Sequence, residues 1–161
     1  MYYLNYFFLF SIIGHFVETH VYLDYESGIL FGCWTPIYGF GTIIILSIYN
    51  FINKKWSLNK VTKFFIVFFI GFILLSILEI IGGYLIEWIF HVTFWDYSHL
   101  KFPITKYTSL EMSFVWGMCS ILVIYFLKPV FDKLIKYIPK FITYIFIILF
   151  IIDCLYTLNL K

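Results

Sequence analysis

Long apolar runs separated by short polar segments make up the chain from end to end. Each run is close to the ~20 residues that a helix needs to cross a bilayer core of ~30 Å. The first run lacks the basic region and the cleavage site of a signal peptide, so we expect it to be retained. The pattern predicts one all-α transmembrane domain over residues 1–161, a polytopic helical bundle of about five spans: residues 3–22, 28–51, 64–88, 108–127 and 141–158.

The second run is interrupted near its start. Thr35-Pro36 is typical of a helix start, because threonine caps helices and proline is tolerated in the first turn. A helix over residues 36–51 would rise only ~24 Å, which is short of the ~30 Å core. Residues 28–34 therefore either complete the crossing as a kinked helix or enter the membrane as irregular backbone. Irregular backbone is tolerated there only where protein or water satisfies its amides.

Two of the polar segments between the runs predict local structure. Residues 24–28, with the sequence Asp-Tyr-Glu-Ser-Gly, predict a short acidic turn. Lys128-Pro129 predicts the end of the fourth span, because proline interrupts a helix. An amphipathic piece over residues 130–137 is expected to follow.

The distribution of lysines predicts the orientation. Residues 53–63 and residues 128–140 carry four lysines each, whereas the segments around Asp24 and Trp95 carry none and two. Lysine-rich loops usually stay in the cytoplasm. With five spans, we expect the amino terminus in the cytoplasm and the carboxyl terminus outside.

The composition agrees with membrane residence. Of the 161 residues, 63% are hydrophobic and 12% are charged, and the mean hydropathy is +0.95, more than a soluble domain requires. The net charge of +2 is too small to indicate nucleic-acid binding, so we expect no nucleic-acid partner. The partner that the composition predicts is the lipid bilayer.

The third run carries two carboxylates on one side of the expected helix. Successive helical residues turn by ~100°, so Glu79, Gly83 and Glu87 drift only ~80° and share one stripe. Carboxylates are costly in hydrocarbon and usually face protein or a water-filled cavity. Because both lie in the outer half of the membrane under the expected topology, we predict an outward-facing polar cavity lined by carboxylates. The alternative is that they bond hydroxyl groups and fix helix packing.

Aromatic and polar motifs add further candidates for the site. The motif Trp-Asp-Tyr-Ser at residues 95–98 fits the lip of a ligand site, or an interfacial belt with an aspartate-initiated turn. The motif Pro-Ile-Tyr-Gly at residues 36–39 fits a substrate loop or a helix start. The substrate-binding residues that we expect are Glu18, Tyr38, Glu79, Glu87, Trp95, Asp96, Tyr97 and Ser98.

The remaining polar residues of the apolar runs fit a metal site poorly. His15 and Glu18 share a helix face, but His20 lies ~180° from His15. The His-Glu-x-x-His spacing of zinc helices is missing, so we expect neither a metal nor a cofactor. Glu111, at the start of a span, is expected to favour the helix dipole. Asp153 is expected to pair with a lysine, a tyrosine or another helix.

Several motifs together resemble one known family. They are residues 36–39, Glu79 and Glu87, residues 95–98 and Trp116-Gly117, and their order fits nearly the whole chain. The chain resembles the bacterial ABC-transporter type IV permease family, the CmpB-like membrane proteins. The resemblance implies a permease-like subunit in the bacterial plasma membrane.

The chain departs from that family before the fourth span. Where the family tends to have a Gly-Arg pair, this chain has Lys101 and Lys106. If the arginine holds a carboxylate or a solute in relatives, one of these lysines would have to substitute for it. A lysine lacks the planar fork of arginine, so it would hold the same group differently.

The absence of a phosphate-binding loop from the sequence bears on the partners. In an ABC system, a separate ATPase subunit would dock on the cytoplasmic segments, residues 53–63 or residues 130–139. Five spans make a small permease. We therefore expect a homo-oligomer or a larger membrane complex to enclose a path.

These features leave three functions open. The first is a membrane transporter component, an ABC-type permease-like subunit in which Glu79, Glu87 and Asp96 contact a cationic or hydroxylated solute. The second is an intramembrane enzyme acting on a lipid or headgroup, with Glu79, Glu18 or Asp96 as general base or metal ligand. The third is a non-catalytic membrane assembly protein whose acids serve packing.

Overall fold

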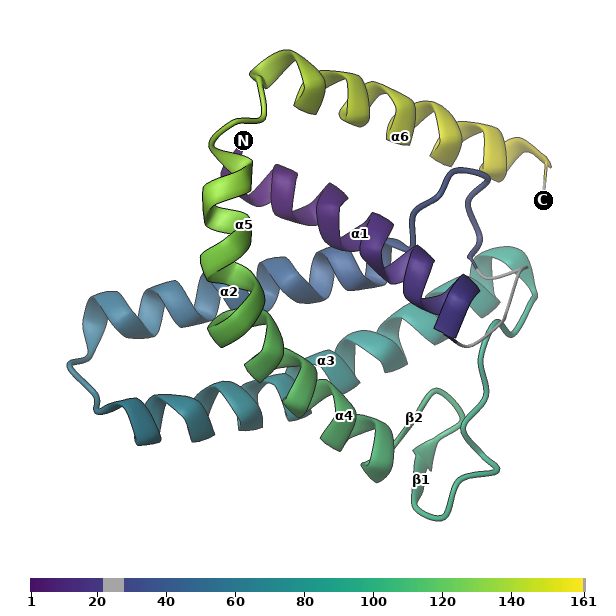
Figure 1. The fold of residues 1–161 in the computed structure, drawn as a ribbon. Coiled ribbons are helices and arrows are strands. Elements are labelled where there is room, and N and C mark those ends of the chain that lie inside the picture. The colour runs from purple at the N-terminus through teal and green to yellow at the C-terminus, as the bar shows by residue number, and fades with distance from the viewer. Residues whose placement is uncertain (22–27, 161) are drawn as a thin grey trace. The chain divides into compact units, whose positions relative to one another are not determined.

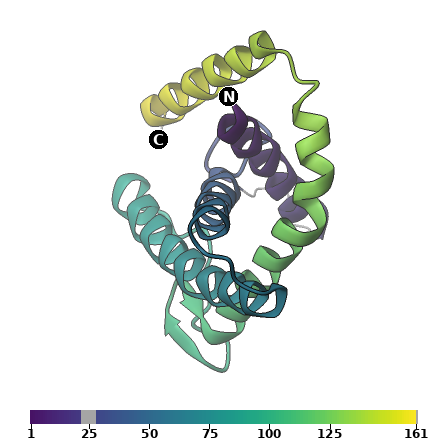
Figure 2. The ribbon, with the colours of Figure 1, turned by 90° about the vertical axis from the view of Figure 1, so that its left-hand side faces the viewer.

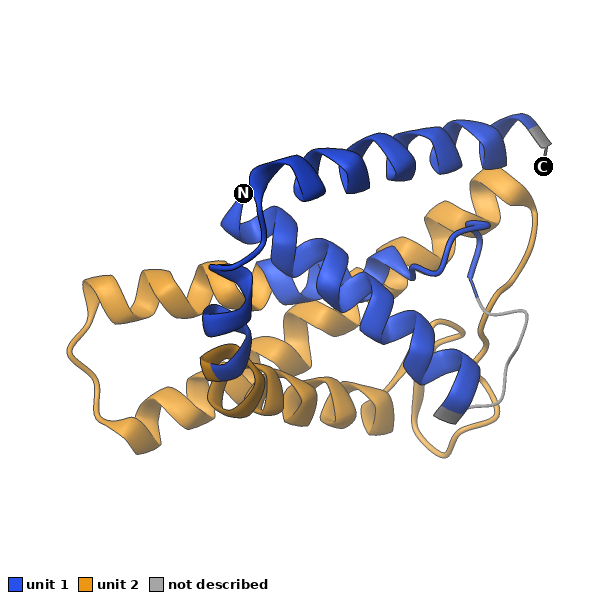
Figure 3. Cartoon of the chain, turned by 45° about the horizontal axis from the view of Figure 1, so that its top comes forward, with its two compact units in different colours: residues 1–43, 130–161 blue, residues 44–129 orange. Residues whose placement is uncertain are grey.

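The computed structural model describes residues 1–21 and 28–160, and the regular elements of this part are helices apart from one small sheet (Figure 1). Most of the predicted acidic turn, residues 24–27, lies outside the described residues. The chain divides into two compact units, residues 1–43 with 130–161 and residues 44–129 (Figure 3). Its elements in chain order are α1 (Tyr2–Val21), α2 (Pro36–Lys55), α3 (Lys60–Phe90), β1 (Pro103–Thr105), β2 (Thr108–Ser109), α4 (Leu110–Ile121), the π-helix η1 (Leu122–Leu127), α5 (Lys128–Ile135) and α6 (Lys140–Leu160).

Four helical stretches in the described part of the chain are long and apolar enough to cross a membrane. They are α2, α3, the stretch Leu110–Ile135 and α6. This confirms the prediction of an all-α polytopic membrane protein. α1 has 20 residues, the length of a span, but its second half contains the polar residues His15, Glu18 and His20. The four stretches together with α1 are consistent with about five spans.

α2 resolves the alternative left open for the second run. The helix begins at Pro36, as predicted, and continues to Lys55. Its 20 residues rise ~30 Å, so it can cross the core without the residues before it. Residues 28–35 are irregular, and Gly28 has a φ of +104°, a left-handed conformation that glycine adopts readily.

α3 is longer than the apolar run that predicted it. The Asn59 side chain accepts a hydrogen bond from the Thr62 N–H at 2.7 Å and caps the start of the helix. The helix ends before His91, which has a φ of +56°. Its 31 residues rise ~46 Å, well beyond the ~30 Å core, so its ends reach the interfacial regions.

The prediction that Lys128-Pro129 ends the fourth span is wrong. α4, η1 and α5 form one helical stretch from Leu110 to Ile135. In η1 the Lys128 N–H bonds the carbonyl of Val123, five residues back, immediately before Pro129. Proline has no N–H and crowds the preceding turn of an α-helix. The wider π turn relieves this crowding, so the helix continues past the proline.

The segment between α3 and α4 contains a hairpin that the hydrophobic pattern does not predict. β1 and β2 pair in antiparallel fashion and leave Lys106 and Tyr107 at the tip. The Tyr107 N–H donates to Thr105 Oγ1 at 3.1 Å, which stabilises the turn. Strands of two or three residues are too short for alternation to be recognised in a sequence.

In the unit of residues 1–43 and 130–161, buried polar pairs and aromatic contacts join the helices. Thr143 of α6 donates to Asn5 of α1 at 2.6 Å. Tyr6 of α1 donates to Asp132 of α5 at 2.8 Å. The ring of Phe8 in α1 stacks on the ring of Phe146 in α6, with their centroids 5.6 Å apart. Side-chain hydrogen bonds of this kind join helices where hydrocarbon offers no competing partner.

In the unit of residues 44–129, α3 and α4 pack side by side (Figure 2). Ser76 of α3 bonds Ser113 of α4, and Gly71 of α3 lies against Ser120 of α4. The contacts move towards the start of α3 as they move towards the end of α4, so the two helices are antiparallel. A Cβ at Gly71 would overlap the Ser120 hydroxyl, because small residues let the helices approach closely. The buried residues of α3 are Val67, Gly71, Leu75, Ser76, Glu79 and Gly83.

Candidate functional site

Glu79 of α3 is buried between its own helix and the segment that leads to α4. The residue is 3% exposed. Its Oε1 accepts a hydrogen bond from the Tyr97 hydroxyl at 3.2 Å, and its Oε2 accepts one from the Thr108 hydroxyl at 2.9 Å. These donors are neutral, so they satisfy the oxygens without balancing a negative charge.

A seam of serine hydroxyls continues from Glu79 between α3 and α4. The Ser76 hydroxyl bonds the Ser113 hydroxyl at 2.7 Å, and Ser113 in turn donates to the carbonyl of Ser109 at 2.8 Å. All three serines are buried. The interior of this helix pair is therefore polar over about one helical turn next to the acid.

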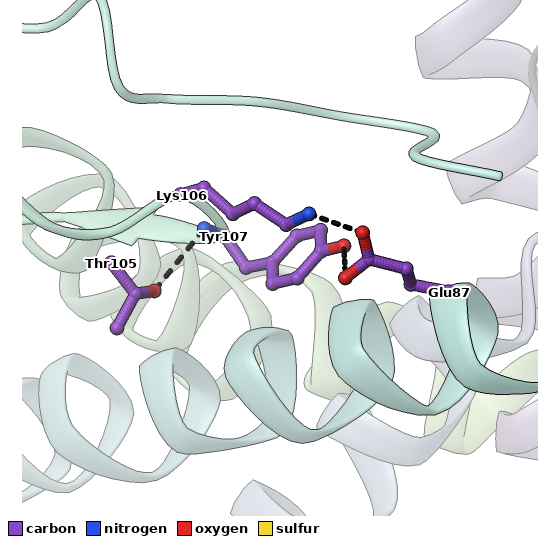
Figure 4. Close-up of polar contacts among 4 residues, drawn as sticks. All are labelled: Glu87, Thr105, Lys106 and Tyr107. Carbon is purple, nitrogen blue, oxygen red and sulfur yellow. Dashed lines mark hydrogen bonds and ion pairs between the residues drawn. The ribbon is translucent and has the colours of Figure 1, made fainter. Parts of the chain in front are cut away.

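Glu87 lies two turns beyond Glu79 and holds the tip of the hairpin (Figure 4). Its Oε2 accepts a hydrogen bond from the Tyr107 hydroxyl at 2.8 Å. Its Oε1 pairs with the ammonium group of Lys106. The side chains of Glu87 and Lys106 are 37% and 32% exposed, so this ion pair lies within reach of water. The hydrogen bond to Glu87 raises the pKa of Lys106 above its usual value.

Gly83 lies between the two acids and supports the Tyr107 ring. Tyr107 is 1% exposed, and a Cβ at Gly83 would overlap its ring atoms. The stripe of Glu79, Gly83 and Glu87 predicted from the sequence thus faces one segment, which reaches all three residues. A glycine in a membrane helix leaves room for a neighbour to approach closely. At Gly83 the neighbour is the hairpin tip.

The Trp-Asp-Tyr-Ser motif divides into two inward and two outward residues. The Trp95 indole donates to the Tyr107 carbonyl at 3.1 Å, and the Tyr97 hydroxyl donates to Glu79. Asp96 is exposed and accepts a hydrogen bond from the Ser98 N–H at 2.7 Å, which forms an aspartate-initiated turn. Bonds from Ser98 hold the pKa of Asp96 below its usual range.

Two further predicted residues, Glu18 and Tyr38, belong to the unit of residues 1–43 and 130–161. Glu18 Oε2 accepts a hydrogen bond from the Thr35 hydroxyl at 3.1 Å. The Tyr38 ring lies against Gly14 of α1, where a Cβ would overlap it. Both residues therefore have partners within their own unit.

Asp153 of α6 has partners of another kind than those expected. Its carboxylate accepts hydrogen bonds from the backbone N–H groups of Phe31 at 3.1 Å and Gly32 at 2.8 Å. It also accepts one from the Trp34 indole at 2.6 Å. The partner is thus the irregular segment before α2, rather than a lysine, a tyrosine or a helix. The carboxylate satisfies amides that irregular backbone leaves open.

Glu111 lies in the first turn of α4, as expected for an acid that favours the helix dipole. Ser109 caps this helix by accepting a hydrogen bond from the Met112 N–H at 3.1 Å. Glu111 Oε1 accepts another from the Phe102 N–H at 3.1 Å, which ties the hairpin to the helix start.

Sequence reasoning missed Thr108 and Tyr107 as partners of the two acids. It mentioned Lys106 only as a substitute for an arginine of the resembling family. The available signal was a lysine and a tyrosine side by side in a loop bounded by two acid-bearing runs. Such a pair becomes informative only when the hairpin is known.

Within residues 1–21 and 28–160, no group of three histidine, cysteine or acidic side chains is placed to hold a metal ion. A cleft of about 310 Å³ lies near the start of α3, lined by Lys60, Val61, Phe64 and Tyr125. Its lining includes none of the residues around Glu79. The outward-facing polar cavity stays a prediction.

The fold and the site together define a class: a multi-pass α-helical membrane protein in which a buried carboxylate, Glu79, is bonded by the segment that joins two packed helices. The sequence of residues 5–158 matches the family described as "Putative ABC-transporter type IV", the CmpB-like proteins. The chain belongs to this family, which confirms the resemblance drawn from its motifs. Neither a curated protein nor a solved structure matches the chain.

Proposed function

We propose that the chain is the membrane-spanning, permease-like subunit of an ABC transporter for a cationic or hydroxylated solute. The observation that carries this proposal is Glu79, a carboxylate that is 3% exposed in a membrane-spanning helix and bonded by neutral hydroxyl groups. Acids inside membrane helices are costly and are kept mainly where they serve transport or proton transfer. Family membership supplies the transporter class.

The surroundings of Glu79 favour a charge-dependent role over helix bridging. An acid that only bridged helices would be served equally by an uncharged amide at lower desolvation cost. The hydroxyl groups of Tyr97 and Thr108 can accept as well as donate, so together with Glu79 they offer oxygen ligands to a cation. Glu87 and Asp96 extend this set towards water, since both are more exposed.

The proposal includes partners. Nucleotide hydrolysis must come from a separate ATPase subunit, docked on one of the two lysine-bearing segments, residues 53–63 or residues 130–139. Two or more copies of the chain would enclose a path that one copy is too small to form. The location is the bacterial plasma membrane, with the amino terminus in the cytoplasm.

The test is Glu79→Gln in the complex purified with its ATPase and reconstituted into vesicles. Radiolabelled organic cations and polyols serve as probes, and uptake and ATP hydrolysis are measured. We expect the variant to fold, because glutamine keeps the shape of glutamate and its amide can still bond the hydroxyls of Tyr97 and Thr108. We expect it to lose uptake and solute-stimulated hydrolysis.

Glu111→Gln is the matched control, because Glu111 lies in the same helix pair and bonds backbone at the edge of the hairpin. It should retain activity. An active Glu79→Gln complex would move the functional centre to Asp96 or Glu18. Full activity of the chain without nucleotide or ATPase would refute the transporter class and favour an enzyme.

A further inference from the structure

The Glu87 carboxylate already holds an ammonium group, one that the chain itself supplies. Lys106 Nζ bonds one carboxylate oxygen and lies 4.9 Å from the centroid of the Tyr107 ring. The Tyr107 hydroxyl bonds the other oxygen at 2.8 Å (Figure 4). A carboxylate beside an aromatic face is the combination that recognises ammonium groups, through charge-assisted hydrogen bonds and cation–π attraction.

The Tyr107 ring is held rigidly in this arrangement, whereas the Lys106 side chain is not. Tyr107 is 1% exposed, rests on Gly83, and accepts a bond from Trp95 at its carbonyl. The Lys106 carbonyl is also fixed, by the Tyr97 N–H at 2.8 Å. The Lys106 side chain, by contrast, is 32% exposed on a flexible four-carbon stem. It can therefore leave Glu87 while the aromatic wall and the backbone stay in place.

We propose that Glu87 and Tyr107 form a subsite for the primary ammonium group of a solute, which Lys106 occupies while no solute is bound. This inference rests on the proposed function and narrows its solute to amines that carry a primary ammonium. A primary ammonium has three N–H donors to offer the carboxylate, whereas a quaternary one has none. Lys106 acts as a tethered competitor, so a solute must displace it.

The experiment measures binding of methylammonium to the full-length chain in detergent by titration calorimetry. Lys106→Met removes the competitor and keeps most of the stem, so we expect about tenfold tighter binding than in the wild type. Lys106→Arg should bind more weakly than the wild type, because a guanidinium holds a carboxylate through two parallel bonds. The binding affinity for tetramethylammonium should change little in either variant.

Lys101→Met is the matched control, because Lys101 belongs to the same segment and lies over the Phe102 ring, 5.2 Å from its centroid. Its affinity for methylammonium should equal that of the wild type. Adding Glu87→Gln to Lys106→Met should abolish the gain. Equal affinities across the Lys106 series, or a gain that persists without Glu87, would overturn the subsite.

The assay stays informative if one variant fails to fold or if the transporter class is wrong. Lys106→Arg retains the ion pair, so its weaker binding can be read without Lys106→Met. Binding requires neither ATPase nor vesicles. The predicted order of affinities without any transport would overturn the proposed function alone, and transport without that order would overturn the subsite alone.

Discussion

Gly83 is the residue on which the seating of the hairpin tip depends most directly. A Cβ there would overlap the ring of Tyr107, which is 1% exposed and bonds Glu87. We expect Gly83→Ala to lower the free energy of unfolding by about 1–3 kcal/mol, because the buried ring must move. Thermal unfolding in detergent measures the effect.

Gly82→Ala is the control for this change. Gly82 points ~100° away around the helix, and alanine favours helices over glycine. Its unfolding midpoint should equal or exceed that of the wild type. If the two alanine variants unfold at the same temperature, the contact between Gly83 and Tyr107 does not govern stability.

At the scale of elements, Asp153 fixes the irregular segment before α2. Replacing it by alanine leaves two backbone N–H groups and the Trp34 indole without their acceptor. The bonds from Gly32 and Trp34 are partly buried, and each unsatisfied buried donor costs about 1–3 kcal/mol, so we expect Asp153→Ala to be strongly destabilising. Asp153→Asn keeps one acceptor oxygen and should fall between alanine and the wild type.

Unfolding midpoints and hydrogen exchange over residues 29–35 measure this order. Ile152→Ala is the neighbouring control, because Ile152 is 56% exposed and truncating its side chain removes little buried surface. We expect faster exchange in the segment for the Asp153 variants only. Unchanged exchange in Asp153→Ala would mean that the segment is held by other contacts.

At the scale of the whole molecule, the first question is which side of the membrane each loop faces. Ser57 and Ser98 are exposed and lie beyond opposite ends of α3. In a background without the native cysteines, a cysteine replacing Ser57 should react only with a cytoplasmic label and one replacing Ser98 only with an external label. Reaction of both from one side would refute the expected topology.

The helices were largely predictable because their signal is local. An apolar run of about 20 residues specifies a membrane helix wherever it occurs, since backbone groups in hydrocarbon must bond within the segment. The start of α2 at Pro36 was predictable from a local signal too, because proline has a fixed φ and no N–H donor. At Pro129 the local rule failed, because the preceding π turn absorbed the proline.

The sequence by itself determined that this is an all-α membrane protein of its family, and that Glu79 and Glu87 share one helical stripe. Only the tertiary structure decided which residues contact these two carboxylates. The hydroxyl of Thr108 reaches Glu79 across 29 residues of chain, and Asp153 bonds a segment 121 residues before it. Helical periodicity fixes the direction of a side chain on its own helix. Its partner depends on how a distant segment folds and packs, which no local pattern records.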